Sequence, residues 1–186
     1  MRIISKPENE YSLFSRFMFW LQKRKFGTVL EPTKIWGRSS WLYFGFNIFY
    51  AAIVRKSSPL EPALISLVNT RVAQINHCPF CIDLNSSFLQ KQGITLEKII
   101  ALSDFETSEL FTEKERIALS YAEAMTKTDK GVDDDLFQKL QKFFSENEII
   151  ELTATIAFEN LSSKFNAALA IPAQGLCQLP QNNDKK

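Results

Sequence analysis

Apolar side chains recur along much of this chain at intervals of three and four residues, the spacing that places them on one face of an α-helix. One such stripe consists of Leu64, Leu67, Val68, Val72 and Ile75, and another of Leu136, Phe137, Leu140, Phe143 and Phe144. No segment alternates apolar and polar residues over a useful length, and no Asn-Gly or Asp-Gly pair joins two apolar runs. The pattern predicts an all-α fold.

Capping residues locate the predicted helices more closely. A serine or threonine followed three residues later by glutamate forms a capping box, and this pattern occurs at Ser58, Thr112 and Ser145. Gly27, Pro32 and Gly37 break the helical pattern in the N-terminal part. We therefore predict helices at 8–24, 39–54, 59–76, 79–92, 95–102, from 113 onward, at 133–144 and from 146 to about 170.

The N-terminal part is unusually aromatic, because 13 of the 23 aromatic residues lie among the first 50. These side chains form either part of the core, a subunit interface or an apolar lid over a substrate. The run 39–54 is shorter than the roughly 20 apolar residues that span a bilayer, and Gly45 and Asn47 interrupt it. We expect a buried or interface helix here and no membrane span.

Composition limits the function classes. With 186 residues, 45% of them hydrophobic, and a net charge of +1, the chain suits one globular domain without the basic surface that nucleic acid requires. We expect a single domain at 1–180, with aromatic-rich helices at 1–57, a core at 58–172 and a disordered tail at 181–186. Three cysteines are too few for a secreted disulfide framework, so we expect a cytoplasmic protein.

Two of the three cysteines and the only histidine lie together at His77, Cys78 and Cys81. Pro79 favours the first position of a helix, which makes Cys78 its cap. Cys78 then faces unpaired amides that stabilise a thiolate, and Cys81 lies on the same face, near enough for a disulfide. His77 either shuttles a proton or is an exposed turn residue.

Four interpretations of the cysteine pair compete. Structural zinc needs four ligands, and only His77, Cys78, Cys81 and the distant Cys177 exist, so we predict no metal. A thioredoxin domain needs a strand before the motif. Two inert buried thiols are possible in a core. We favour a reversible dithiol that needs no cofactor and that reduces a peroxide or a partner disulfide.

The residues 64–83, LISLVNTRVAQINHCPFCID, resemble the core motif of the carboxymuconolactone decarboxylase and AhpD-like alkylhydroperoxidase superfamily. The similarity extends over about 55–172 and includes 121–126 and 158–166. It implies an AhpD-like helical bundle that assembles as a homo-oligomer, a trimer or hexamer. The family pattern has a glutamate and a histidine that relay protons to the thiol, and Ser66 and Asn85 occupy those positions here. His77, Asp83 and Glu123 are the candidate replacements.

The resemblance implies a thiol oxidoreductase that acts on a hydroperoxide or a protein disulfide, with electrons returned by a thiol reductant. A non-catalytic oligomeric protein that senses redox state or binds a ligand is the first alternative. A lactone decarboxylase is the second. Keeping the cysteine pair while losing the glutamate and histidine argues for redox chemistry over decarboxylation.

Overall fold

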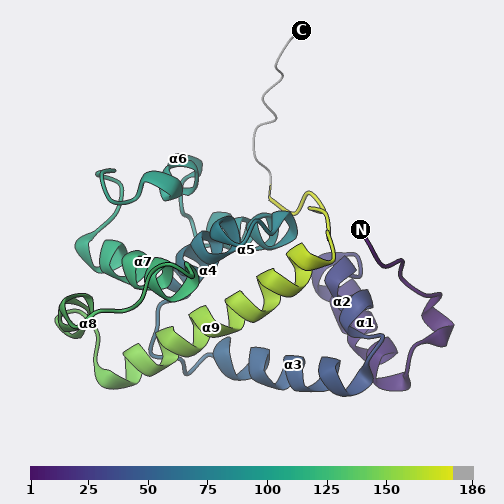
Figure 1. Cartoon of the computed structure of the whole chain (residues 1–186). Coiled ribbons are helices and arrows are strands. Elements are labelled where there is room, and N and C mark those ends of the chain that lie inside the picture. The colour runs from purple at the N-terminus through teal and green to yellow at the C-terminus, as the bar shows by residue number, and fades with distance from the viewer. Residues whose placement is uncertain (178–186) are drawn as a thin grey trace, which may run out of the picture.

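The computed structural model describes residues 1–177, and every regular element in that range is helical (Figure 1). The α-helices are α1 Leu13–Phe26, α2 Glu31–Trp36, α3 Ser40–Ile53, α4 Pro62–Ile75, α5 Pro79–Lys91, α6 Leu96–Ile100, α7 Glu113–Thr126, α8 Asp134–Gln141 and α9 Glu146–Ala168. Two 3₁₀ helices, η1 Glu8–Glu10 and η2 Ala101–Asp104, complete the set. The absence of strands from residues 1–177 confirms the all-α prediction, and the predicted tail at 181–186 lies outside the described residues.

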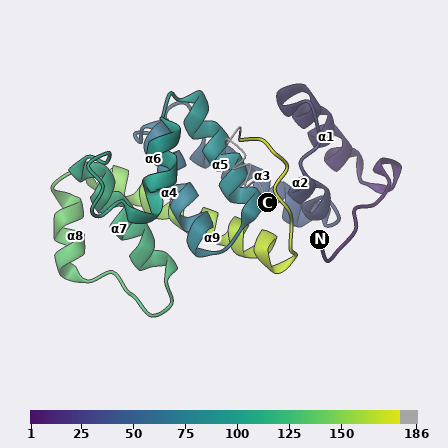
Figure 2. The ribbon, with the colours of Figure 1, turned by 90° about the horizontal axis from the view of Figure 1, so that it is seen from above.

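The long helix α9 is the centre of the arrangement (Figure 1). Helices α7 and α8 lie beside its N-terminal end, and α1 and α2 lie near its C-terminal end, as the view from above also shows (Figure 2). Between α4, α5, α7 and α9 the core is closely packed, and Leu67, Val72, Leu119 and Leu152 have no exposed surface. This core holds α4 and α5 rigidly against α9.

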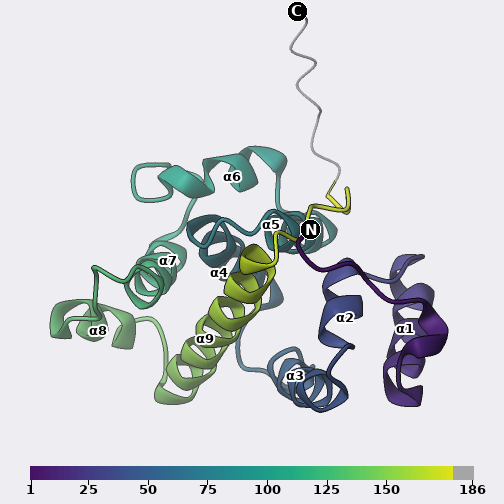
Figure 3. The same ribbon diagram turned by 45° about the vertical axis from the view of Figure 1, so that its right-hand side comes forward.

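The aromatic N-terminal part packs on α9 through ring contacts. Trp36 of α2 stacks on Phe165 of α9 with 3.8 Å between ring centroids, and Phe46 of α3 lies 4.8 Å from Trp36. Figure 3 shows α2 between α9 and α1. The opposite face is open, with Trp41 85% exposed and Phe17 53% exposed. The aromatic residues therefore serve partly as core and partly as an uncovered surface.

Three helix predictions were wrong in the N-terminal half. The helix predicted at 8–24 begins at Leu13, because Ser12 caps it by accepting a hydrogen bond from the Ser15 amide. Helix α2 was missed, because it has only six residues and Leu30 offers no side-chain cap. Helix α4 begins at Pro62, not at Pro59, because Pro62 takes the first turn and holds Glu61 in an extended conformation. The Ser58 hydroxyl instead accepts a hydrogen bond from the Leu60 amide, in a turn before the helix.

The helix starts predicted at Thr112 and Ser145 are confirmed, since both residues form complete capping boxes. The run 39–54 forms α3, and none of the helices between residues 1 and 177 is long and apolar enough to cross a membrane.

Candidate active site

A disulfide joins Cys78 and Cys81 at the start of α5. Cys78 is the cap of this helix, as the sequence predicts: its Sγ accepts a hydrogen bond of 3.2 Å from the Cys81 amide, and Pro79 takes the first position. Both cysteines are buried, Cys78 completely and Cys81 to 3% exposure. The pair is therefore screened from bulk solvent and from large reagents.

The turn between α4 and α5 explains the position of His77. Its amide bonds to the carbonyl of Gln74, and the Cys78 amide bonds to the carbonyl of Ala73, which together form a Schellman motif. His77 occupies the left-handed position of this motif with φ 52°, where glycine is the usual residue. Its side chain is exposed and does not line the cavity described below. The geometry thus favours the turn role that the sequence left open.

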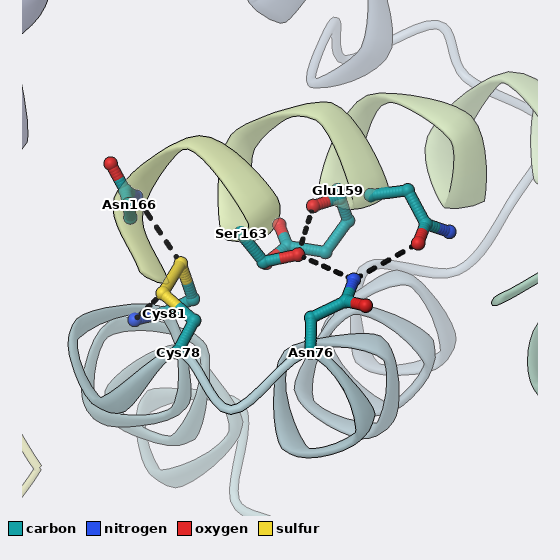
Figure 4. The surroundings of a disulfide bond; sticks show 7 residues. Asn76, Cys78, Cys81, Glu159, Ser163 and Asn166 are labelled. Atoms are coloured by element: carbon teal, nitrogen blue, oxygen red, sulfur yellow. Dashed lines mark hydrogen bonds between the residues drawn. A yellow bond between two sulfur atoms is a disulfide. The ribbon is translucent and has the colours of Figure 1, made fainter. Parts of the chain in front are cut away.

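Asparagines bind the disulfide and the end of α4 to α9 (Figure 4). The Asn166 side chain donates a hydrogen bond from Nδ2 to Cys81 Sγ at 3.3 Å. From the end of α4, Asn76 Nδ2 donates to Asn160 Oδ1 and to Ser163 Oγ, both at 2.9 Å. The sulfur atoms are consequently held against a fixed face of α9.

A cavity of about 600 Å³ opens beside Cys81. Cys81 lines it and Cys78 does not, and Ser66 and Asn85, the two substituted family positions, also line it. The walls carry aromatic side chains from both halves of the chain, among them Phe26, Trp36, Phe46, Phe80, Phe88 and Phe158. The structure therefore brings three predicted site residues together and places an apolar space next to one reactive sulfur.

Glu159 is a cavity residue that the sequence interpretation missed. It lies on α9, is only 6% exposed, and its carboxyl Oε1 makes no hydrogen bond. Burial raises the pKa of Glu159 to about 8, although a hydrogen bond with the Asn85 side chain opposes the shift. A signal did exist, because Glu159 continues the heptad spacing of the buried residues Leu152 and Ile156 and so falls on the buried face of its helix.

The structure places the other two candidate acids away from the cavity. Asp83 accepts three hydrogen bonds from the backbone amides of Gln174, Leu176 and Cys177, at 2.7 to 3.0 Å, and so fixes the C-terminal segment. Glu123 forms ion pairs with Arg71 of α4 and with Lys127, the residue that caps the C-terminal end of α7. Both carboxylates are satisfied by structural partners, and neither is available to the sulfur atoms.

No group of three or more His, Cys, Asp or Glu side chains between residues 1 and 177 is arranged to hold a metal ion. Cys177, the third cysteine, is partly buried and is not in a disulfide. Burial raises the pKa of its thiol, and the charge of Asp83 adds to this effect. These features leave the disulfide and its cavity as the candidate active site.

Residues 1–177 thus form an all-helical fold with a Cys-x-x-Cys disulfide at a helix start beside an apolar cavity, and these features are those of a helical thiol–disulfide protein. The sequence profile of the carboxymuconolactone decarboxylase family matches residues 42–124. The uncharacterized protein YnjA of Escherichia coli (strain K12) is 41% identical over 175 residues, which cover 94% of this chain and 96% of that protein. The chain therefore belongs to the carboxymuconolactone decarboxylase and AhpD-like superfamily.

Solved structures share the fold at low sequence identity. An uncharacterized peroxidase-related protein from Ralstonia eutropha JMP134, described as an alkylhydroperoxidase AhpD core, has a TM-score of 0.85 and 15% identity over 95% of each chain. A variant of the debrominase Bmp8 in complex with 2,3,4-tribromopyrrole has a TM-score of 0.81 and 19% identity, and the match covers 95% of this chain and 93% of that one. The matched folds thus include a debrominase and a peroxidase-related protein.

Proposed function

We propose that this protein is an AhpD-like thiol oxidoreductase that reduces an organic hydroperoxide through the Cys78/Cys81 couple. The observation that carries the proposal is the buried disulfide whose Cys81 lines a largely apolar cavity of about 600 Å³. Membership of the superfamily supports redox chemistry at this motif. A cavity of this size and polarity favours a small apolar substrate over a protein disulfide, which would have to bring a folded partner to a buried sulfur.

Cys81 is the attacking cysteine in this proposal. Capping alone favours Cys78, but Cys78 has no exposed surface and does not line the cavity. Cys81 lies in the first turn of α5, and Asn166 donates a hydrogen bond to its sulfur, and both features stabilise a thiolate. Cys78 then attacks the oxidised Cys81 and forms the disulfide.

The reaction balances with a hydroperoxide as oxidant and a thiol as reductant. The Cys81 thiolate attacks the terminal peroxide oxygen, the O–O bond breaks, and the products are a sulfenic acid and an alkoxide that takes up a proton. The Cys78 thiol displaces hydroxide from that sulfenic acid, which forms the disulfide and water. Two equivalents of an external thiol reduce the disulfide and leave as their own disulfide. A reducing compartment such as the cytoplasm supplies such thiols.

The uncovered aromatic surface supports a homo-oligomer, with a trimer or hexamer as the expected state. Trp41, Leu42, Ile48 and Phe49 on α3 are all at least 43% exposed. Exposed apolar side chains concentrated on one helix are typical of a protein interface. Size-exclusion chromatography with light scattering on wild type and on Trp41→Glu measures the assembly, and a monomeric wild type would remove this part of the proposal.

A hydroperoxide consumption assay tests the function, with mass analysis of the unreduced protein. Wild type should consume cumene hydroperoxide repeatedly in the presence of dithiothreitol. Cys81→Ser should be inactive, and Cys78→Ser that is reduced beforehand and freed of dithiothreitol should react once and stop at a sulfenic acid. If Cys81→Ser consumes hydroperoxide as fast as wild type, the proposal fails.

Three further measurements on the same variants separate the alternatives. Oxidation that stays stoichiometric, without cycling, would favour a redox-sensing or binding protein. Lactone decarboxylation that survives alkylation of both cysteines would favour the lyase. A halogenated pyrrole, the ligand class of the Bmp8 complex, serves as a competing substrate and reports whether the cavity accepts a flat aromatic ring.

A further inference from the structure

Glu159 is a buried carboxyl group without an ionic partner. Among residues 1–177, no lysine, arginine or histidine forms an ion pair with it. Its Oε1 atom is buried without a hydrogen bond, and its side chain lines the cavity that Cys81 also lines. An acid in such surroundings costs stability, so its presence beside a reactive sulfur indicates a chemical role.

The packing of α5 against α9 brings this acid close to the sulfur. Asn166 of α9 contacts Cys81, and seven residues earlier Glu159 interacts with Asn85, which is four residues after Cys81. The two helices therefore run antiparallel at this contact. Cys81 and Glu159 also line the same cavity, so a substrate or water inside it can join the sulfur to the carboxyl group.

We propose that Glu159 is the proton-transfer group of this site, and that it accepts the proton of the Cys81 thiol and delivers it to the leaving oxygen of the substrate. The proposal rests on the hydroperoxide reduction described above and names the residue that serves it. The other candidates are excluded by position: His77 is exposed, Asp83 is saturated by backbone amides, and Glu123 is ion-paired.

The proton balance closes over one cycle. Glu159 as a carboxylate takes the proton from the Cys81 thiol, which leaves a thiolate and a neutral carboxylic acid. The thiolate attacks the hydroperoxide, and the carboxylic acid gives its proton to the departing alkoxide to form an alcohol. Glu159 is then a carboxylate again, ready for the next thiol after the disulfide is reduced. Transfer in both directions requires an acid whose pKa lies near the working pH.

The surroundings of Glu159 meet this requirement. Burial raises the pKa of Glu159 to about 8. Besides Cys81 of α5, the neutral titratable groups that line the same cavity are two tyrosines of α3, Tyr43 and Tyr50, whose own pKa values are raised by burial so that they stay protonated. The cations that line the cavity, Lys25, Arg55 and Lys56, are exposed.

The test compares two oxidants on the reduced protein by stopped flow. Cumene hydroperoxide leaves as an alkoxide and needs a proton, whereas peracetic acid leaves as acetate, a group with a pKa of about 4, and does not. Glu159→Gln should slow the reaction with cumene hydroperoxide by about 100-fold or more and affect peracetic acid far less. Glu159→Asp should recover part of the loss. Glu146→Gln removes an exposed carboxylate from the same helix and should change neither rate.

The pH profile provides a second readout. The mechanism needs one proton held between Cys81 and Glu159, so the cumene hydroperoxide rate of wild type should rise as this pair loses its first proton and fall as it loses its second, and Glu159→Gln should lack the fall. Equal slowing of both oxidants by Glu159→Gln, or wild-type rates with both, would overturn the proposal. Circular dichroism confirms that the variants fold.

A thiol measurement keeps this inference separable from the proposed function. In a Cys78→Ser, Cys177→Ser background, the reaction of Cys81 with methyl methanethiosulfonate is followed against pH. A charged Glu159 disfavours the thiolate, so the profile should show an inflection near pH 8 that Glu159→Gln abolishes. If wild type reduces no hydroperoxide, the proposed function fails, and this inflection still decides whether Glu159 exchanges protons with Cys81. A profile unchanged in Glu159→Gln would overturn the inference.

Discussion

Two glutamates are buried to almost the same degree in this protein, Glu123 at 5% exposure and Glu159 at 6%, yet their surroundings differ completely. Burial alone would raise the pKa of Glu123, but hydrogen bonds and charges from Lys127 and Arg71 lower it below its ordinary value. Glu159 meets no cation, and burial raises its pKa to about 8. The exposed area of a carboxyl group therefore does not by itself set its charge state; its partners contribute as well.

The carboxylate of Glu123 stabilises the packing of helices, whereas that of Glu159 does not. Around Glu123, the Arg71 Nε atom donates at 2.7 Å and ties α4 to α7, so the charge contributes to packing. Around Glu159, the neighbours are one amide side chain and an apolar cavity, and the group is held in a state that opposes stability. Proteins accept such costs where chemistry needs them, which is why the second region is the candidate site.

The largest effect expected from this comparison is on stability at Glu123. Glu123→Gln leaves Arg71, whose side chain is 14% exposed, without its carboxylate, and the free energy of unfolding should fall by about 3 kcal/mol. Urea denaturation followed by circular dichroism measures the loss. The thiol reactivity of Cys81 in the folded variant should stay at the wild-type level, because Glu123 does not line its cavity. A double variant, Arg71→Met with Glu123→Leu, should recover much of the stability; if it does not, the ion pair is not the cause.

The second effect is a pH dependence at Glu159. Its pKa is raised in the folded protein, from the ordinary 4.5 to about 8, so the folded state binds more protons than the unfolded chain between these values. Stability should therefore fall as the pH rises through this window, by up to about 1.4 kcal/mol per pH unit, and level off above about pH 8.

Glu159→Gln removes the titrating group and should flatten this part of the stability curve. Thermal denaturation of wild type and variant across the window provides the measurement, with Glu146→Gln as control. If the stability of wild type and of Glu159→Gln changes equally with pH, the pKa of Glu159 is not raised in the folded protein.

The contrast between the two glutamates also shows which features the sequence could predict. Cys78 as a helix cap, and Thr112 and Ser145 in capping boxes, were predicted because each depends on residues within one helical turn. The start of α4 was mispredicted because Ser58, Pro59 and Glu61 together carry the signature of a helix start, whereas the helix begins at Pro62 and its cap residue Glu61 makes no side-chain capping bond. A capping signature alone therefore does not fix where a helix begins.

In the candidate site, too, local features were predictable from the sequence and features that depend on packing were not. The cysteine pair was predictable from its spacing, whereas the role of Glu159 depends on how α9 packs against α5, about 75 residues away in sequence. The sequence carried a hint, a glutamate in register with Ile156 on a buried face, but nothing local distinguishes an unpaired acid from one with a partner. For the same reason Glu123 and Asp83 looked like candidates until their partners were visible.

Asp83 gives a third environment, a carboxylate satisfied by backbone amides alone. Asp83→Asn would direct an amide donor at backbone donors, and we expect a loss of about 2 kcal/mol together with looser packing of residues 174–177. Hydrogen exchange measures the segment. Because the Asp83 charge contributes to the raised pKa of Cys177, that pKa should fall in the variant, whereas Asp104→Asn, at an exposed site, should leave it unchanged.

The smallest effect is expected at His77, the exposed residue directly before Cys78. Its backbone holds the left-handed position of the turn with φ 52°, which asparagine tolerates well, so His77→Asn should change stability by less than about 0.5 kcal/mol. His77→Val, with a branched side chain that resists this conformation, should cost about 1 to 2 kcal/mol. Both variants should retain the pH profile of Cys81 reactivity, measured by methyl methanethiosulfonate. A profile that changes in His77→Asn but not in Glu159→Gln would assign the proton transfer to the imidazole. The unpaired state of Glu159 would then have no role in the chemistry.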